Sequence, residues 1–92
     1  MTVADTMRLK LTRAFHPSAL EIVDESHLHA GHAGARAGGE THFRVAIVAE
    51  AFAGLSRIAR HRKVHETLSE ELAGGVHALA ITARTPGEAG AR

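Results

Sequence analysis

An alternating apolar segment near the middle of the chain sets its architecture. In the stretch THFRVAIVA, residues 41–49, the side chains of Phe43, Val45 and Ile47 recur at every second position. Successive side chains of a β-strand point to opposite faces, so this alternation predicts a strand with one face buried against a core. A shorter strand is predicted over residues 20–24, and the two strands are expected to pair as an antiparallel hairpin closed by a long loop.

Two helices and a third strand complete the order expected from the sequence. Apolar residues at helical spacing predict a first helix that ends at Pro17, because a proline ring disfavours helix at the residue before it. A second helix, which can be split near His61, is expected over residues 55–73, and the stretch VHALAITAR predicts a strand over 76–84. This α-β-β-α-β order predicts an α+β fold, with a three-stranded sheet and helices on one face.

The chain is short enough to form one domain with a thin core. It has 92 residues, of which 45% are hydrophobic but only 3% aromatic, so aliphatic side chains must fill most of the interior. We therefore expect a single domain over residues 1–92, with a flexible loop at 25–40 and a frayed tail at 85–92. A partner or a second copy could stabilise such a core, and the free protein is expected to be a monomer or a weak homodimer.

Cysteine is absent from the sequence, which excludes disulfides and any zinc or iron–sulfur site built only from the chain's own thiolates. No apolar run reaches transmembrane length, residues 1–15 lack the apolar stretch of a signal peptide, and Asp5 is atypical of a transit peptide. We expect a cytoplasmic protein without a membrane partner. The net charge of +1 is too balanced for the whole surface to attract nucleic acid, so an electrostatic binding site must be local.

Eight histidines point to metal chemistry, because neutral imidazole binds zinc, copper and iron. His27, His29 and His32 span six residues of a glycine-rich segment that can bend to bring them together. The alternative is a solvated loop that is merely rich in histidine. His77 is expected to open the last strand with the side-chain parity of Leu79, either as a half-buried histidine or as a rigidly held ligand. A rigid ligand combined with loop ligands would form a site that closes on a cofactor.

A cluster of cations on the second predicted helix is the candidate for binding nucleic acid. It consists of Arg57, Arg60, Arg62 and Lys63. Such a cluster can contact phosphates, although its members do not share one helical face and a solvated charged helix is the alternative. The apolar stripe predicted for this helix consists of Val64, Leu68 and Leu72. His61 and His65 lie near it, and we expect them to be histidines at the edge of the core rather than ligands.

Catalytic motifs are missing from the sequence. There is no cysteine nucleophile, no serine in a nucleophile elbow, and neither an HExxH sequence nor a phosphate-binding loop. We therefore expect a protein without enzymatic activity.

Five stretches, taken in order, resemble the BolA family. They are Leu20-Glu21-Ile22 followed by Asp24-Glu25-Ser26; Gly39-Glu40-Thr41-His42-Phe43; Phe52-x-Gly54; Arg60-His61-Arg62-x-Val64; and Val76-His77-Ala78-Leu79-Ala80-Ile81, with Thr85-Pro86 after it. The resemblance runs from about residue 7 to residue 88. It implies a fold similar to the KH nucleic-acid-binding domain, although Gly54 stands without the GxxG loop that clamps nucleic acid in KH domains.

The resemblance also implies a function. Members of the family pair with monothiol glutaredoxins and share a [2Fe–2S] cluster in iron–sulfur assembly and trafficking, with thiolates from the glutaredoxin cysteine and its bound glutathione. One family ligand falls on His77 and the other on His29, with His32 or His27 as alternatives because this loop holds extra histidines. No cofactor is expected in the isolated chain. Bacterial members resemble DNA-binding transcriptional regulators of morphology and stress response, which makes duplex DNA the alternative partner and the cation cluster its site.

Overall fold

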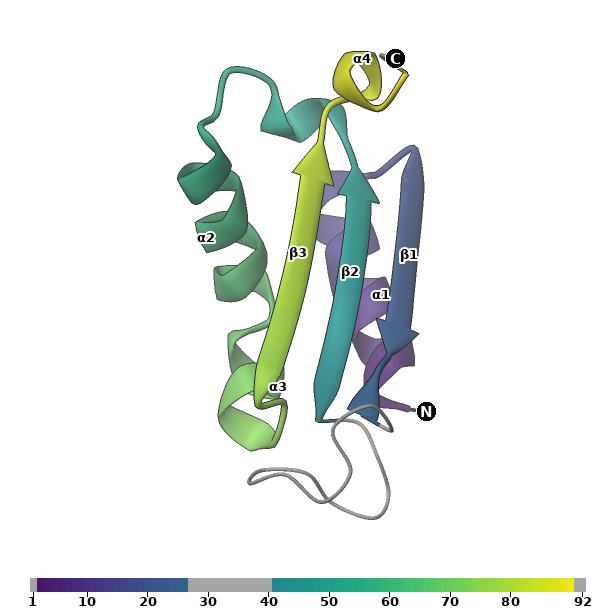
Figure 1. The fold of residues 1–92 in the computed structure, drawn as a ribbon, viewed down its shortest axis with the longest axis vertical. Coiled ribbons are helices and arrows are strands. Elements are labelled where there is room, and N and C mark those ends of the chain that lie inside the picture. The colour runs from purple at the N-terminus through teal and green to yellow at the C-terminus, as the bar shows by residue number, and fades with distance from the viewer. Residues whose placement is uncertain (1, 27–40, 91–92) are drawn as a thin grey trace.

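The computed structural model describes residues 2–26 and 41–90, and it has the expected α-β-β-α-β order with a split second helix (Figure 1). Its elements are α1 (Val3–Phe15), β1 (Ala19–Asp24), β2 (His42–Val48), the 3₁₀ turn η2 (Glu50–Phe52), α2 (Arg57–Thr67), α3 (Ser69–Gly74), β3 (Ala78–Arg84) and α4 (Pro86–Ala89). No helix in these two ranges is both long enough and apolar enough to cross a membrane.

The strands form one three-stranded mixed sheet with β2 in the centre. β2 runs antiparallel to β1, with Ile22 opposite Val45, which confirms the predicted hairpin. β3 pairs with β2 in parallel, with Val45 opposite Ile81. A parallel partner needs a crossover connection, and the segment containing α2 and α3 provides it. The helices of this crossover cover one face of the sheet together with α1, so the predicted arrangement of helices on one face is confirmed (Figure 1).

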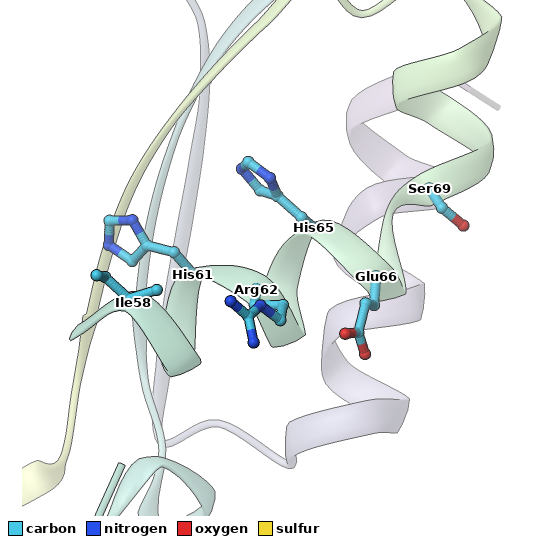
Figure 2. A pocket seen from close by; sticks show the side chains of 6 residues that line it. All are labelled: Ile58, His61, Arg62, His65, Glu66 and Ser69. Atoms are coloured by element: carbon cyan, nitrogen blue, oxygen red, sulfur yellow. The ribbon is translucent and has the colours of Figure 1, made fainter. Parts of the chain in front are cut away.

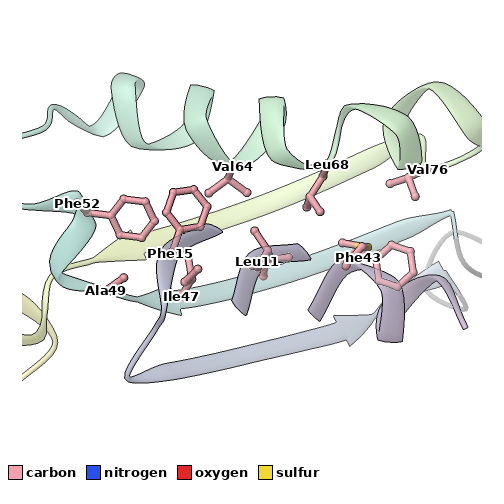
Figure 3. Packing of buried hydrophobic residues seen from close by; sticks show 11 residues of the cluster. Leu11, Phe15, Phe43, Ile47, Ala49, Phe52, Val64, Leu68 and Val76 are labelled. Atoms are coloured by element: carbon pink, nitrogen blue, oxygen red, sulfur yellow. The ribbon is translucent and has the colours of Figure 1, made fainter. Parts of the chain in front are cut away.

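The core lies between this face of the sheet and helices α1 and α2 (Figure 3). The buried hydrophobic residues are Met7, Leu11, Phe15, Phe43, Val45, Ile47, Ala49, Phe52, Val64, Leu68 and Val76. The rings of Phe15 and Phe52 pack together, with their centroids 5.0 Å apart. All three phenylalanines of the chain are thus buried in an otherwise aliphatic core, as the composition predicts.

The split in the second helix lies at Leu68 rather than near His61, the position suggested by the sequence. Leu68 leaves the regular helical conformation at φ −104° and ψ 20°, and its side chain is fully buried. The change of direction brings α3 to α1, where Lys10 contacts the carboxylates of Glu70 and Glu71 at 2.9 and 2.7 Å. Tertiary contacts therefore determine the position of the break, which has no glycine or proline to mark it.

The C-terminal segment forms a short helix, α4, where a frayed tail is predicted from the sequence over residues 85–92. Thr85 caps this helix: its side chain accepts a hydrogen bond from the N–H of Glu88, whose carboxylate accepts one from the N–H of Thr85. Both terminal nitrogens of Arg60 also donate to Glu88. The contact from α2 holds this polar segment in place, which corrects the prediction as far as residue 90; residues 91–92 lie outside the described ranges.

Candidate functional site

The first residues of β2 and β3 lie side by side at one end of the sheet, because the two strands are parallel (Figure 1). This end carries His42, the first residue of β2, and His77, the residue before β3. The carbonyl oxygen of Thr41 accepts hydrogen bonds from the N–H groups of His77 at 2.7 Å and Ala78 at 3.2 Å. The backbone of His77 is therefore anchored to the sheet, whereas its side chain is exposed rather than half-buried.

A second imidazole, that of His42, lies close to the ring of His77. The two ring centroids are 6.4 Å apart, and the ring planes make an angle of 31°. The Nδ1 atom of the half-buried His42 lies 2.8 Å from Oγ1 of Thr41, so the hydroxyl group orients this ring. His42 is not among the site residues predicted from the sequence. Each of the two histidines stands at the start of a strand predicted from the sequence. If the parallel pairing of these strands had been known, their positions would have identified His42 as a neighbour of His77.

The residues that flank positions 27–40 are tied together beside these histidines. Ser26 and Thr41 are both buried, with 5% and 0% of their surfaces exposed. The Oγ atom of Ser26 accepts hydrogen bonds from the N–H groups of Thr41 at 2.9 Å and His42 at 3.1 Å. Ser26 thus belongs to the packed structure, although it falls within the flexible loop predicted over 25–40.

The predicted loop ligands His27, His29 and His32 lie outside the described residues. Within residues 2–26 and 41–90, no three or more histidine, aspartate or glutamate side chains converge in a way that could hold a metal ion. The described part of the site therefore consists of one exposed, anchored histidine with a second imidazole beside it.

The structure separates the four predicted nucleic-acid-binding cations into two groups. Three of them are exposed on α2: Arg57, Arg62 and Lys63. The side chain of Arg60 is only 12% exposed and donates to the carboxylate of Glu88. It also donates to the backbone carbonyls of Leu55 at 3.0 Å and Ala83 at 3.1 Å. Hydrogen bonding from Arg60 is the main cause that lowers the pKa of Glu88 to about 2. Arg60 is thus engaged in anchoring α4.

The two histidines that flank the cations differ from each other in exposure. His61 is half-buried, which matches the position predicted for it at the edge of the core, whereas His65 is exposed. Both line a shallow groove along α2 (Figure 2). The prediction of a core-edge position is therefore wrong for His65, because this residue falls on the solvent side of the stripe that contains Val64 and Leu68.

Comparison with known proteins identifies the family of the chain. A family model described as BolA-like protein matches residues 11–88. The chain is 51% identical over 89 residues to "Uncharacterized protein in cobS 5'region" from Sinorhizobium sp., and the match covers 96% of both proteins. It is 56% identical over 86 residues to BolA-like protein 1 from Mus musculus, which covers 94% of this chain and 60% of the mouse protein.

Two further relatives extend the comparison to a named regulator and to a solved structure. DNA-binding transcriptional regulator BolA from Vibrio cholerae is 43% identical over 86 residues, which covers 94% of this chain and 77% of that protein. The structure of BolA1 from Arabidopsis thaliana superposes with a TM-score of 0.86 at 42% sequence identity, and covers 96% of both chains. Since the family model and these relatives span most of the sequence, the chain belongs to the BolA family.

Proposed function

We propose that this protein is an adaptor that supplies histidine ligands to a [2Fe–2S] cluster shared with a monothiol glutaredoxin, in cytoplasmic iron–sulfur cluster assembly and trafficking. The observation that carries the proposal is the exposed imidazole of His77, whose backbone is anchored to Thr41 at the end of the sheet where segment 27–40 begins and ends. In this role the cluster is cargo, and the chain performs no catalytic reaction of its own.

The donor groups of the chain fit one half of such a cluster. Iron–sulfur clusters are usually held by thiolates, but two histidines can replace two cysteines on one iron. The chain has eight histidines and no cysteine, so it can supply imidazoles and must rely on a partner for thiolates. In the family these come from the glutaredoxin cysteine and its bound glutathione.

The proposed ligands are His77 and His29, with His32 or His27 as alternatives to His29. His29 follows Ser26 by three residues. Ser26 is hydrogen-bonded to Thr41, whose carbonyl oxygen accepts the N–H of His77, so the segment that contains His29 leaves the described structure at the end of the sheet that carries His77.

Reconstitution tests the assignment of His77. The purified chain is mixed with a monothiol glutaredoxin, iron, sulfide and glutathione, and the absorption and circular dichroism spectra are recorded. We expect His77→Ala to abolish the spectrum of the histidine-ligated cluster, because the ring of His42, the other described histidine at this end of the sheet, is half-buried and held by Thr41. His65→Ala is the matched control: it removes another exposed imidazole, from α2, and should keep the wild-type spectrum. A folded His77→Ala variant with the wild-type spectrum would contradict the proposal.

The three histidines of segment 27–40 should be partly interchangeable as the second ligand. His27 and His32 lie two and three residues from His29, and presenting either one instead costs on the order of 1 kcal/mol per residue that must be fixed. His29→Ala is therefore expected to weaken or alter the cluster spectrum without abolishing it. Replacement of all three by alanine should have the same effect as His77→Ala.

Duplex DNA is the alternative partner, favoured by the exposed cations of α2 and by the name of the Vibrio cholerae relative. These cations would bind the phosphates of the DNA backbone rather than its bases. The affinity of the variant Arg57→Ala/Arg62→Ala/Lys63→Ala should therefore fall by a similar factor for every DNA sequence. The plot of log K against log salt concentration should also become less steep. Its slope should change by about 0.9 for each phosphate that the variant no longer neutralises. Arg60 is left intact because it anchors α4, and Arg13→Ala on α1 is the control. An unchanged slope in the triple variant would exclude this surface.

A further inference from the structure

His61 and His65 lie four residues apart on α2, so their side chains leave the same side of the helix. Figure 2 shows both imidazole rings on this side, whereas the side chains of Arg62 and Glu66 project away from it. The two histidines line one shallow groove. They are separate from the proposed cluster site, because α3 lies between α2 and the end of the sheet that carries His77 (Figure 1).

We propose that His61 and His65 form a second metal site, a two-imidazole chelate for a divalent transition-metal cation of the Cu²⁺, Ni²⁺ and Zn²⁺ class. The Cβ atoms of residues at i and i+4 of a helix are about 5–6 Å apart. A histidine nitrogen binds such a cation at about 2.0–2.1 Å, so one cation between the rings can reach a nitrogen of each. Imidazole suits these cations, and the chain offers them no competing thiolate.

The two rings differ in a way that favours chelation. His61 is half-buried and partly held by its surroundings, whereas the exposed His65 can rotate toward it. Burial is the main cause that lowers the pKa of His61, followed by the charges of Arg57 and His65. Burial thus disfavours the charged form of the His61 imidazole, and the neutral form has a lone pair available to a cation.

The neighbours of the pair define what kind of site it is. Arg57 and Arg62 oppose a dication and Glu66 attracts one, but all three are exposed, so salt screens their effect. No third ligand joins the pair among the described residues, which leaves coordination positions for water or for a donor from a partner. The affinity of such an open site for divalent transition-metal cations should follow the general order of these cations, so Cu²⁺ should bind more tightly than Ni²⁺ or Zn²⁺.

Amide NMR spectra of the full chain with substoichiometric Cu²⁺ test the site, because this paramagnetic cation broadens the signals of nearby residues. We expect broadening across residues 58–69, besides any broadening around the other histidines. The matched control is the exchange Arg62→His/His65→Arg, which keeps the composition, the net charge and the number of histidines. It places the two imidazoles at adjacent positions that do not face each other, so the broadening on α2 should disappear while that around the other histidines remains.

Two results would overturn the proposal: no broadening on α2 at Cu²⁺ concentrations that broaden other histidines, or equal broadening in wild type and exchange variant. If the exchange disturbs the fold, as judged by amide dispersion, His65→Asn takes its place and should also eliminate the broadening on α2. The His77→Ala variant separates this site from the cluster site. It should keep the broadening on α2 whatever the outcome of the glutaredoxin reconstitution.

Discussion

Ser26 organises the end of the sheet through a single buried hydroxyl group. Its Oγ atom accepts hydrogen bonds from the N–H groups of Thr41 and His42, and its proton is donated to a carboxylate oxygen of Asp24. Because Thr41 in turn accepts the N–H of His77, the serine hydroxyl is linked through one residue to the proposed ligand. A residue without metal-binding chemistry thereby supports the position of one that has it.

Replacement of Ser26 by alanine should destabilise the protein. The substitution leaves the N–H of fully buried Thr41 without its partner, and an unsatisfied buried group costs about 1–3 kcal/mol. We expect the free energy of unfolding, measured by urea denaturation, to fall by that amount. Ser69→Ala is the control, since the residue is exposed and a change within about 0.5 kcal/mol is expected. If Ser26→Ala also stays within about 0.5 kcal/mol, the hydroxyl does not have the structural role described above.

At the scale of the elements, α4 is held to α2 by a charged contact between Arg60 and Glu88. Hydrogen bonding from Arg60 first, and from the backbone of Thr85 second, lowers the pKa of Glu88 from its ordinary value of 4.5 to about 2. A carboxyl group whose pKa is lower in the folded state adds stability above its unfolded pKa. That stability is lost as the pH falls through the folded pKa. The anchoring of α4 should therefore weaken between about pH 5 and pH 2.

The pH dependence of the melting temperature tests this contact. In the wild type the melting temperature should fall as the pH is lowered from about 5 toward 2, and Glu88→Gln should show a smaller fall because the amide does not titrate. Glu21→Gln, on the exposed side of β1, is the matched control and should keep the wild-type profile. Identical profiles for the wild type and Glu88→Gln would show that the carboxylate does not contribute.

Local patterns predicted the elements that are held by apolar side chains. The alternation of Phe43, Val45 and Ile47 was enough to predict β2, because one face of this strand is buried and the other is not. Its pairing with β1 was predicted because a single loop joins the two strands. The helix α4 was missed, although residues 85–88 have the spacing of a capping box. A helix of four residues is not stable by itself, and the partner that holds it, Arg60, lies 28 residues away in the sequence.

Contacts between residues that are far apart in the sequence also limited what could be predicted of the candidate site. His77 could be proposed from the sequence because it precedes an alternating strand and matches the BolA pattern. Its neighbour His42 could not, since the two residues become neighbours only through the parallel pairing of β2 with β3. The role of Arg60 was obscured in the same way: among other cations it resembles a phosphate ligand, and only the position of α4 assigns it to Glu88.

For the whole molecule, one crossover joins the core to the site. The chain leaves β2, passes through α2 and α3, and returns so that β3 starts beside β2. The helices of the crossover bury Val64 and Leu68 in the same cluster as Leu11 of α1 and the inner face of β2. The position of His77 beside Thr41 is therefore a consequence of how the crossover packs on the sheet, and it should persist only while the core is intact.

Because a single core cluster joins α1, α2 and the sheet, the domain should unfold as one unit. Leu11 is fully buried, and Leu→Ala substitutions in cores cost about 2–5 kcal/mol. That is a large part of the roughly 5–15 kcal/mol typical of a whole domain, so Leu11→Ala should shift the urea midpoint strongly. Ile58→Ala is the control, since this side chain is 72% exposed and a change within about 0.5 kcal/mol is expected.

The chain has no Trp or Tyr, so far-ultraviolet circular dichroism and amide NMR are the suitable probes. Coincident transitions are expected for α1 and β3 signals, and separate transitions would show that α1 melts independently of the sheet end that positions His77.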